Sequence, residues 1–219
     1  RQFARRLGFR GEKCWDGVYA CDWEKFTTRR TGPLPRSFLF VGRYIRRKGI
    51  DILVDAYAKY RERVENPWQL VCAGSGEQEA LLNRQTGIYN KGFVQPDELP
   101  GLMKAAGAFV LPSREEPWGV VVEEAAAASL PLICSEACGS AVHLLQDRYN
   151  GYLVQTESAE HLAQCMAALS TLPDETRRRM GARSHALSKQ YTPVRWTDTL
   201  ISGIHDWYAS DRSPARTVR

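Results

Sequence analysis

The sequence lacks several features that would place it in a special class of protein. No apolar run approaches the roughly eighteen residues needed to cross a bilayer, and we expect no signal peptide at its start. The four histidines are dispersed and form no H-x-x-x-H or H-E-x-x-H set. Cys134 and Cys138 have no second cysteine pair at zinc-site spacing. These absences argue against a membrane span and a metal site, and no internal repeat is evident.

The composition is that of an ordinary globular domain. Of the 219 residues, 43% are hydrophobic and 25% are charged, which predicts a full core. The net charge of +5 comes mostly from arginine and suits phosphate or an anionic surface, but scattered surface arginine explains it as well. We therefore predict no nucleic-acid partner. The cysteines in apolar runs favour a reducing cytoplasm, with peripheral contact at the inner face of the membrane left open.

Strand-like and helix-like stretches alternate from residue 37 onward. This alternation predicts βαβ units and hence a Rossmann-like, doubly wound parallel sheet, with ligands outside the carboxyl ends of the strands. We expect one domain over 37–209, a linker or arm from a missing N-terminal neighbour over 1–36, and a flexible tail over 210–219. The chain starts without Met and is expected to be a fragment. Strands are predicted at 37–41, 68–73, 88–94, 108–111, 131–135 and 151–154, and helices at 49–64, 77–84, 97–106, 120–128, 141–145, 158–169, 174–189 and 193–208.

The most informative stretch is S-R-E-E-P-W-G-V-V-V-E-E, which begins at Ser113. It follows an apolar run and opens into an alanine-rich run, which predicts a strand, a tight loop and a helix start. A helix start presents free N–H groups and a positive dipole end, both of which suit a phosphate. Glu116 and Glu124 stand eight positions apart around this start. Two carboxylates are odd for phosphate alone but fit a ligand that also carries hydroxyls, such as a sugar nucleotide.

Three other loops also follow predicted strands. Gly42 allows close approach to a ligand, and Arg43 and Lys48 could bracket a diphosphate, although a basic surface loop has the same composition. The A-G-S-G segment around Gly74 could line a phosphate or form a plain tight turn. The G-F-V-Q-P segment, with Phe93 and Val94, could pair with a base edge or form a simple junction.

In this order, the motifs resemble a known family. They run F-V-G-R-x4-K-G, A-G-S-G, G-F-V-x-P-x-E-L, L-P-S-x-x-E-P-W-G-x4-E, L-P-x-I-C and N-G-x-L-V. The pattern is similar to the C-terminal, donor-binding half of family 4 (group 1) retaining glycosyltransferases, which have the two-domain GT-B fold. The resemblance covers about residues 14 to 208. Ser129, Ser140 and His143 depart from the family pattern near the presumed site and put the identity of the donor sugar in doubt.

The resemblance implies catalytic roles for three side chains. Arg43 and Lys48 would bind the donor diphosphate and stabilise the charge on the departing nucleotide. Glu116 would contact hydroxyls of the transferred sugar, without having to act as a covalent nucleophile. The electrostatic stabilisation of the leaving phosphate would be the larger catalytic effect.

The resemblance also implies a set of contacts that bind the nucleotide sugar. Glu124 would hold the ribose hydroxyls, and the backbone near Phe93 and Val94 would meet the base. Gly42 and Gly74 would give the ligand room. Backbone N–H groups would touch sugar and phosphate at three further positions: Trp118, which stands where Phe is usual, Gly119 and Val120.

These residues predict a donor-binding domain that takes a hexose-type sugar from a nucleoside diphosphate, with UDP favoured, for transfer to a glycan or lipid-linked acceptor. Neither a metal nor another cofactor is expected. Acceptor recognition would lie in the missing N-terminal domain, so the chain alone is expected to be inactive in transfer. Two alternatives stay open. One is half of a GT-B sugar-nucleotide 2-epimerase, and the other is a non-catalytic module that binds a nucleotide sugar.

Overall fold

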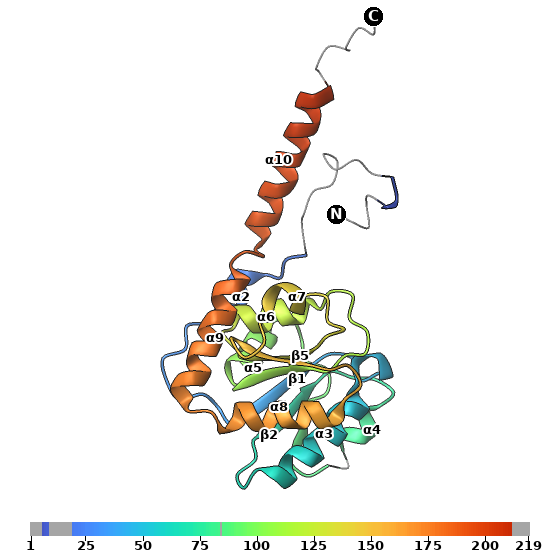
Figure 1. Ribbon diagram of the computed structural model, residues 1–219, viewed down its shortest axis with the longest axis vertical. Helices are drawn as coiled ribbons and strands as arrows, with labels where there is room; N and C mark the ends of the chain where they lie inside the picture. Colours follow the sequence, from blue (N-terminus) through green and yellow to red (C-terminus); the bar gives the residue numbers. More distant parts are fainter. Residues whose placement is uncertain (1–5, 9–18, 84, 212–219) are drawn as a thin grey trace, which may run out of the picture.

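The computed structural model describes residues 6–8, 19–83 and 85–211, with side chains as far as residue 209 (Figure 1). Its centre is a six-stranded sheet in the order β3-β2-β1-β4-β5-β6, and all of its pairings are parallel. The order reverses between β1 and β4, which makes the sheet doubly wound and Rossmann-like, as predicted. The strands are β1 (Ser37–Val41), β2 (Gln69–Ala73), β3 (Ile88–Asn90), β4 (Ala108–Leu111), β5 (Leu132–Ser135) and β6 (Gly151–Val154).

Helices cover both faces of the sheet (Figure 1). On one face α3 (Ile50–Arg63) packs on α8 (Ala159–Thr171), with the short α4 (Glu79–Leu82) beside α3. The other face carries α2 (Trp23–Phe26), α5 (Leu99–Lys104), α6 (Val120–Ala127), α7 (Ala141–Leu144) and α9 (Asp174–Ser188). The last helix, α10 (Pro193–Asp211), extends away from this body. None of the helices in the described ranges is both long and apolar enough to cross a bilayer.

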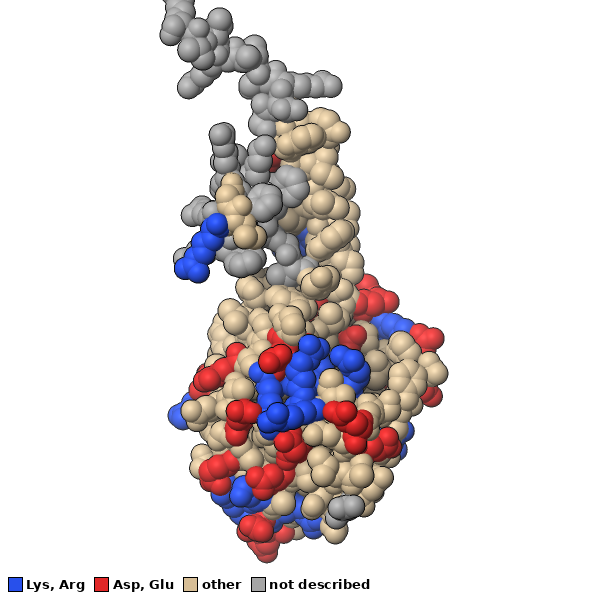
Figure 2. All heavy atoms as spheres, turned by 90° about the vertical axis from the view of Figure 1, so that its right-hand side faces the viewer, with Lys and Arg blue, Asp and Glu red and all other residues tan. Residues whose placement is uncertain are grey.

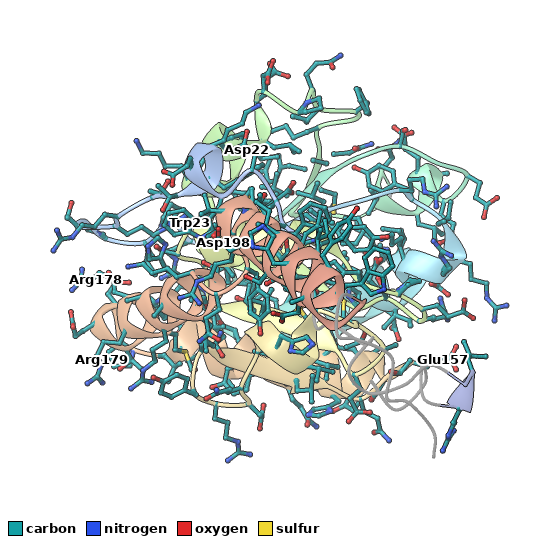
Figure 3. The ribbon with its side chains drawn as sticks, turned by 90° about the horizontal axis from the view of Figure 1, so that it is seen from above. Asp22, Trp23, Glu157, Arg178, Arg179 and Asp198 are labelled. Carbon is teal, nitrogen blue, oxygen red and sulfur yellow. The ribbon has the colours of Figure 1, made fainter. Side chains whose placement is uncertain are left out.

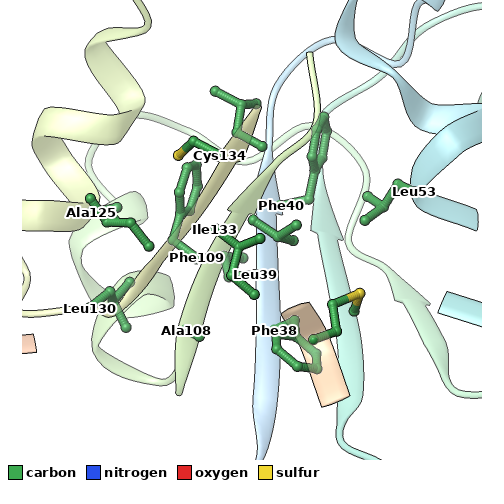
Figure 4. Packing of buried hydrophobic residues seen from close by; sticks show 14 of the residues in the cluster. Phe38, Leu39, Phe40, Leu53, Ala108, Phe109, Ala125, Leu130, Ile133 and Cys134 are labelled. Carbon is green, nitrogen blue, oxygen red and sulfur yellow. The ribbon is translucent and has the colours of Figure 1, made fainter. Parts of the chain in front are cut away.

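The core lies where the central strands meet the helices on both sides. Residues of β4 and β5 are buried along their whole length, as expected for strands covered on both faces. Phe38, Phe40 and Phe109 fill the space around the sheet, and the alanines of α6 allow that helix to approach it closely (Figure 4). The carboxyl ends of β1 and β4 are therefore fixed in a rigid body.

The predicted elements occur, and several differ in extent. The strand expected over 88–94 ends at Asn90, because the Asn90 side chain accepts a hydrogen bond from Gly92 N at 2.8 Å and turns the chain. The helix expected over 77–84 is described only as Glu79–Leu82, and residue 84 lies outside the described residues. Helix α10 continues to Asp211, which is inside the predicted tail. The rest of that tail, residues 212–219, lies outside the described residues.

Residues 19–36 of the predicted N-terminal arm pack against the body. Cys21 and Phe26 are 3% and 4% exposed. The Arg30 guanidinium donates hydrogen bonds to the carbonyl oxygens of Met103, Ala106 and Ala128 at 2.6, 2.7 and 3.0 Å. The indole of Trp23 donates to Ser188 Oγ at 2.9 Å, so α2 lies against α9 (Figures 1 and 3). The role of this segment as a link to a missing neighbour stays a prediction.

Candidate functional site

A cleft of about 590 Å³ opens at the carboxyl ends of β1 and β4. These are the strands between which the sheet order reverses, the place where doubly wound sheets bind ligands. One wall is the basic loop that follows β1, and the other is the loop that leads from β4 into α6. Of the predicted site residues, the lining includes Gly42, Arg43, Lys48, Glu116, Trp118, Gly119, Val120 and Glu124.

The basic loop after β1 is held in place by a buried tyrosine and a glycine. Tyr44 is fully buried, and its hydroxyl donates to Asn90 Oδ1 at 2.9 Å. Gly49 has a φ of 73°, which places it in the left-handed region between the short helix η2 (Arg46–Lys48) and α3. A Cβ at this position would lie 2.2 Å from the carbonyl oxygen of Pro112, which follows β4. Glycine here therefore lets the two walls of the cleft meet.

Arg114 connects the two walls. Its backbone N donates to the carbonyl oxygen of Arg47 at 2.8 Å, and its guanidinium donates to that of Arg46 at 2.8 Å. The guanidinium also binds both carboxylate oxygens of Asp51, at 2.7 and 2.8 Å, and Glu157, at the edge of the body in Figure 3, at 2.7 Å. The hydrogen bond from Arg114 lowers the pKa of Asp51. Arg114 is thus occupied in fixing the basic loop.

Lys48 and Glu116 form an ion pair inside the cleft, in which Lys48 Nζ donates to Glu116 Oε2. Their side chains are only 14% and 9% exposed, so water screens the pair weakly. The backbone of Glu116 is fixed on both sides: its N–H donates to the Ala137 carbonyl at 3.2 Å, and its carbonyl accepts from Gly139 N at 2.9 Å. The cleft therefore places a cation and a carboxylate at defined positions next to each other.

Basic side chains gather on this part of the surface. Arg43, Arg46 and Arg47 are exposed on the loop that follows β1, and Arg43 and Arg47 line the cleft. Figure 2 shows a compact cluster of Lys and Arg side chains on one face of the body, with Asp and Glu side chains around it. Such a cluster favours a ligand with several negative charges.

Helix α6 begins at the other wall. Gly119 precedes its first residue with a φ of 90°, a conformation that glycine adopts readily. A Cβ there would lie 3.0 Å from Cγ of Glu116, so a larger residue would press on that acid. Val120 and Val121 line the cleft at this helix start, where free backbone N–H groups and the dipole favour an anion.

Two neighbouring carboxyl groups in α6 have raised pKa values. Burial raises the pKa of Glu124, which lines the cleft, to about 7, against the opposing effect of Lys25. Burial also raises the pKa of Glu123 to about 7, against hydrogen bonds from Trp118 and the backbone of Cys21. Both carboxyl groups are thus set to change charge near neutral pH, which is common at functional sites.

Three predicted residues are not among those that line the cleft: Gly74, Phe93 and Val94. A Cβ on Gly74 would lie 1.9 Å from the carbonyl oxygen of Gly42, so Gly74 shapes the loop behind the cleft. Phe93 is 67% exposed on the loop that follows β3. The contact of Phe93 and Val94 with a base stays a prediction.

The structure adds residues that the motifs did not indicate. Tyr19 and Arg47 line the cleft, and Glu123 supports it from within α6. Tyr19 lies in the segment that was predicted to be an arm, and no motif marks it. A signal for Glu123 was available, because it is an acid inside an apolar helix run. Among the described residues, no three His, Cys, Asp or Glu side chains gather in a way that could hold a metal ion.

Comparison with known proteins places these features in a family. Residues 25–186 match the family described as Glycosyl transferases group 1. The chain is 34% identical over 166 residues to an uncharacterized glycosyltransferase of Methanocaldococcus jannaschii, covering 71% of this chain and 42% of that protein. It is 30% identical over 196 residues to a GDP-mannose-dependent alpha-(1-6)-phosphatidylinositol monomannoside mannosyltransferase of Mycobacterium tuberculosis, covering 83% of this chain and 49% of that protein.

Solved structures agree on the fold. The UDP complex of Anabaena HepE superposes with a TM-score of 0.77 at 19% identity, covering 92% of this chain and 60% of that one. A sucrose-phosphate synthase from Thermosynechococcus elongatus superposes with a TM-score of 0.74 at 23% identity, covering 88% of this chain and 52% of that one. The chain spans less than half the length of the curated relatives that it matches. With its Rossmann-like sheet and the match over most of its length, the chain belongs to the group 1 glycosyl transferases.

Proposed function

We propose that this chain is the C-terminal, donor-binding half of a family 4 retaining glycosyltransferase of the GT-B fold. It would take a hexose-type sugar from a nucleoside diphosphate, with UDP favoured, for transfer to a glycan or lipid-linked acceptor. The observation that carries the proposal is the cleft itself. It joins a basic loop, a helix start and two carboxylates, Glu116 and Glu124, at the switch point of the sheet.

Each of these residues binds a different part of the donor. Arg43 and Lys48 bind the diphosphate, Arg43 as a fork and Lys48 as a point charge, together with the N–H groups at the start of α6. Glu116 accepts hydrogen bonds from the sugar hydroxyls, and Glu124 accepts them from the ribose. In this arrangement the cations lie where negative charge develops as the nucleotide leaves, which lowers the barrier to transfer.

The ion pair in the cleft gives this division a physical basis. Lys48 is bound to Glu116. A diphosphate offers Lys48 a stronger negative partner than a single carboxylate. When Lys48 turns to the phosphate, Glu116 becomes free to accept hydrogen bonds from the sugar. Donor binding and readiness of the sugar site are thereby coupled.

The remainder of the enzyme would supply the domain that binds the acceptor. Because the chain spans less than half of its curated relatives, we infer that a second half binds the acceptor and completes the catalytic site. The chain alone should bind donor but not transfer sugar. We place the enzyme in the cytoplasm and infer that it needs no metal, because Arg43, Lys48 and the helix start supply the positive charge.

Relatives differ in the nucleotide that they are named for. The Anabaena HepE structure contains UDP, and the M. tuberculosis relative is named GDP-mannose-dependent. Calorimetric titration of the chain with UDP, GDP and ADP, and then with the matching sugar donors, tests the proposal. We expect one nucleotide to bind selectively, and Arg43→Ala or Lys48→Ala to weaken its binding about tenfold or more, the loss of a charged hydrogen bond.

Arg46→Ala is the matched control. Arg46 lies on the same loop and carries the same charge but does not line the cleft. It should leave the affinity close to that of the wild type. Binding of none of the three nucleotides, or equal losses in all three variants, would contradict the proposed donor site.

A further inference from the structure

Glu123 is a buried acid to which the proposed donor contacts assign no role. It lies in the first turn of α6, next to Glu124, and is only 1% exposed. Burying a carboxyl group among apolar residues costs free energy unless hydrogen bonds compensate. Val122 and Ala125 beside it are fully buried, so an apolar residue would suit the position better for packing alone. The carboxyl group therefore calls for an explanation in terms of its partners.

The two oxygens of Glu123 bind two different parts of the chain. Oε1 accepts a hydrogen bond from Nε1 of Trp118 at 2.6 Å, and Oε2 accepts one from the backbone N of Cys21 at 2.8 Å. Trp118 lines the cleft on the loop that leads into α6. Cys21 stands two residues after Tyr19, which lines the cleft from the N-terminal segment. A single carboxyl group thus connects the loop that leads into α6 with the N-terminal segment, and both of these line the cleft.

Other contacts hold Trp118 but leave its indole N–H to Glu123. The carbonyl oxygen of Trp118 accepts from Ser140 N at 2.9 Å. Its ring lies 5.6 Å from the ring of His143, which in turn lies 5.6 Å from that of Tyr191. These contacts fix the backbone and one side of the ring. Without the acceptor at Glu123, no other hydrogen bond among the described residues would hold the indole N–H, and we expect the ring to turn while the backbone stays in place.

We propose that Glu123 is a positioning residue for the nucleotide-sugar donor. Its carboxylate holds Trp118 and the segment that carries Tyr19 in place beside the cleft. This inference rests on the proposed function of the cleft. It concerns a residue that does not itself touch the donor, so its effect passes through Trp118 and Tyr19.

The ionisation of Glu123 should change how firmly it holds Trp118 and the N-terminal segment. A carboxylate accepts both hydrogen bonds at full strength, whereas the protonated acid turns one oxygen into a hydroxyl donor. Since burial raises the pKa of Glu123 to about 7, we expect both hydrogen bonds at full strength above neutral pH and a weaker bridge below it. Titratable groups also face it from its surroundings: Glu124 on α6, Cys21 on the N-terminal segment, Tyr191 after α9, and His143 on α7 through the Trp118 ring.

The test uses the whole 219-residue chain and two measurements. The first is the indole ¹⁵N–¹H spectrum without nucleotide, in which Trp118→Phe identifies the Trp118 signal. We expect that signal to shift with pH near neutrality in the wild type and in His143→Gln, and not in Glu123→Gln. The dispersed signals of the other tryptophans report that each variant is folded.

The second measurement is the affinity, at pH 8, for whichever of UDP, GDP and ADP the wild type binds most tightly. Glu123→Gln should weaken it about threefold to tenfold, because glutamine can accept only one of the two bonds. Glu115→Gln is the matched control, an exposed acid on the same loop that does not line the cleft. In Trp118→Phe the effect of Glu123→Gln should shrink, because one of its two partners is gone.

The outcomes separate this inference from the function on which it rests. If the wild type binds no nucleotide, the proposed function fails and the positioning role fails with it. If the wild type binds and Glu123→Gln binds equally well, only the positioning role is overturned. An equal loss in Glu115→Gln, or a Trp118 indole signal that Glu123→Gln leaves unchanged, would overturn it too.

Discussion

At the scale of single residues, the cleft is built around acids with different partners. Glu116 is paired with Lys48, while Glu124 lines the cleft with no ion pair among the described residues and has a raised pKa. Glu123 is not in the cleft lining and binds Trp118 and the backbone of Cys21. Three carboxyl groups within one short stretch of chain thus have three environments. Their contributions to binding and stability should be separable.

The two acids that line the cleft should respond differently to substitution. Glu124→Ala should weaken binding of free UDP by about 1–3 kcal/mol, the cost of an unpaired charged hydrogen bond. Glu116→Ala should leave free UDP binding nearly unchanged and weaken only binding of the sugar-bearing donor, because the proposed role of Glu116 is to contact the sugar and not the nucleotide. Calorimetry with UDP and with UDP-sugars checks both, and the reverse pattern would refute the division of roles.

The raised pKa values predict a pH dependence of stability. A carboxyl group whose pKa rises from 4.5 to about 7 on folding stabilises the fold fully below pH 4.5 and loses that contribution as pH rises through 7. Between pH 5 and 8 the wild type should therefore lose stability, on the order of 2–3 kcal/mol for each of the two groups. Urea unfolding at several pH values should show this loss reduced in Glu123→Gln and unchanged in Glu115→Gln. A loss that persists in full in Glu123→Gln would contradict the assignment.

At the scale of elements, the position of each loop that follows a strand depends on its contacts with the neighbouring loops. The loop after β1 reaches its position because Gly74, after β2, leaves room for the carbonyl oxygen of Gly42. In the same way, Gly49 leaves room for the carbonyl oxygen of Pro112, which follows β4. Such contacts bring the ends of three strands together. A change in one loop should therefore appear as a change in the cleft.

Gly74→Ala tests this dependence. Its Cβ would lie 1.9 Å from the Gly42 oxygen, in a backbone conformation with φ 149°. We expect a loss of roughly 2 kcal/mol or more in unfolding free energy, together with weaker UDP binding, because the basic loop must move.

Gly101→Ala is the matched control for that change. Gly101 lies inside α5, and a Cβ there would meet no atom within 4 Å. Alanine should therefore stabilise the chain by about 0.5–1 kcal/mol through its helix propensity, with UDP affinity unchanged. Equal effects of the two substitutions in urea unfolding would contradict the predicted clash with the Gly42 oxygen.

The elements themselves were largely predictable. The strands at 108–111 and 151–154 occur as expected, because apolar runs bounded by loop residues identify buried parallel strands. The strand at 88–94 was predicted too long, since the sequence does not show that the Asn90 side chain would bond to the backbone of Gly92. Local pattern thus located the elements, and side-chain contacts set their ends.

At the scale of the whole molecule, α10 stands apart from the sheet and its two helical layers (Figure 1). Val194, Leu200, Ile201 and Tyr208 are between 38% and 69% exposed. Apolar side chains that remain in water contribute little to the stability of the body. The folded unit should therefore be complete without this helix.

Removal of residues 193–219 should change the unfolding free energy by no more than about 0.5 kcal/mol and leave UDP affinity unchanged, because the cleft lies on elements that end before α10. Urea unfolding and calorimetry of the shortened chain check this. A fall of several kcal/mol would mean that α10 packs on the body in solution. Leu70→Ala, at a fully buried position of β2, gives the size of a true core loss, about 2–5 kcal/mol.

The sequence by itself determined the kind of elements, the parallel sheet and the residues most suited to a phosphate and a sugar. It could do so because hydrophobic periodicity, glycines and charges at strand ends are local properties. Only the tertiary structure decided the strand order, the pairing of Lys48 with Glu116, and the place of Tyr19 and Glu123 at the cleft. These depend on contacts between residues far apart in the chain, and packing of the whole body is what brings such residues together.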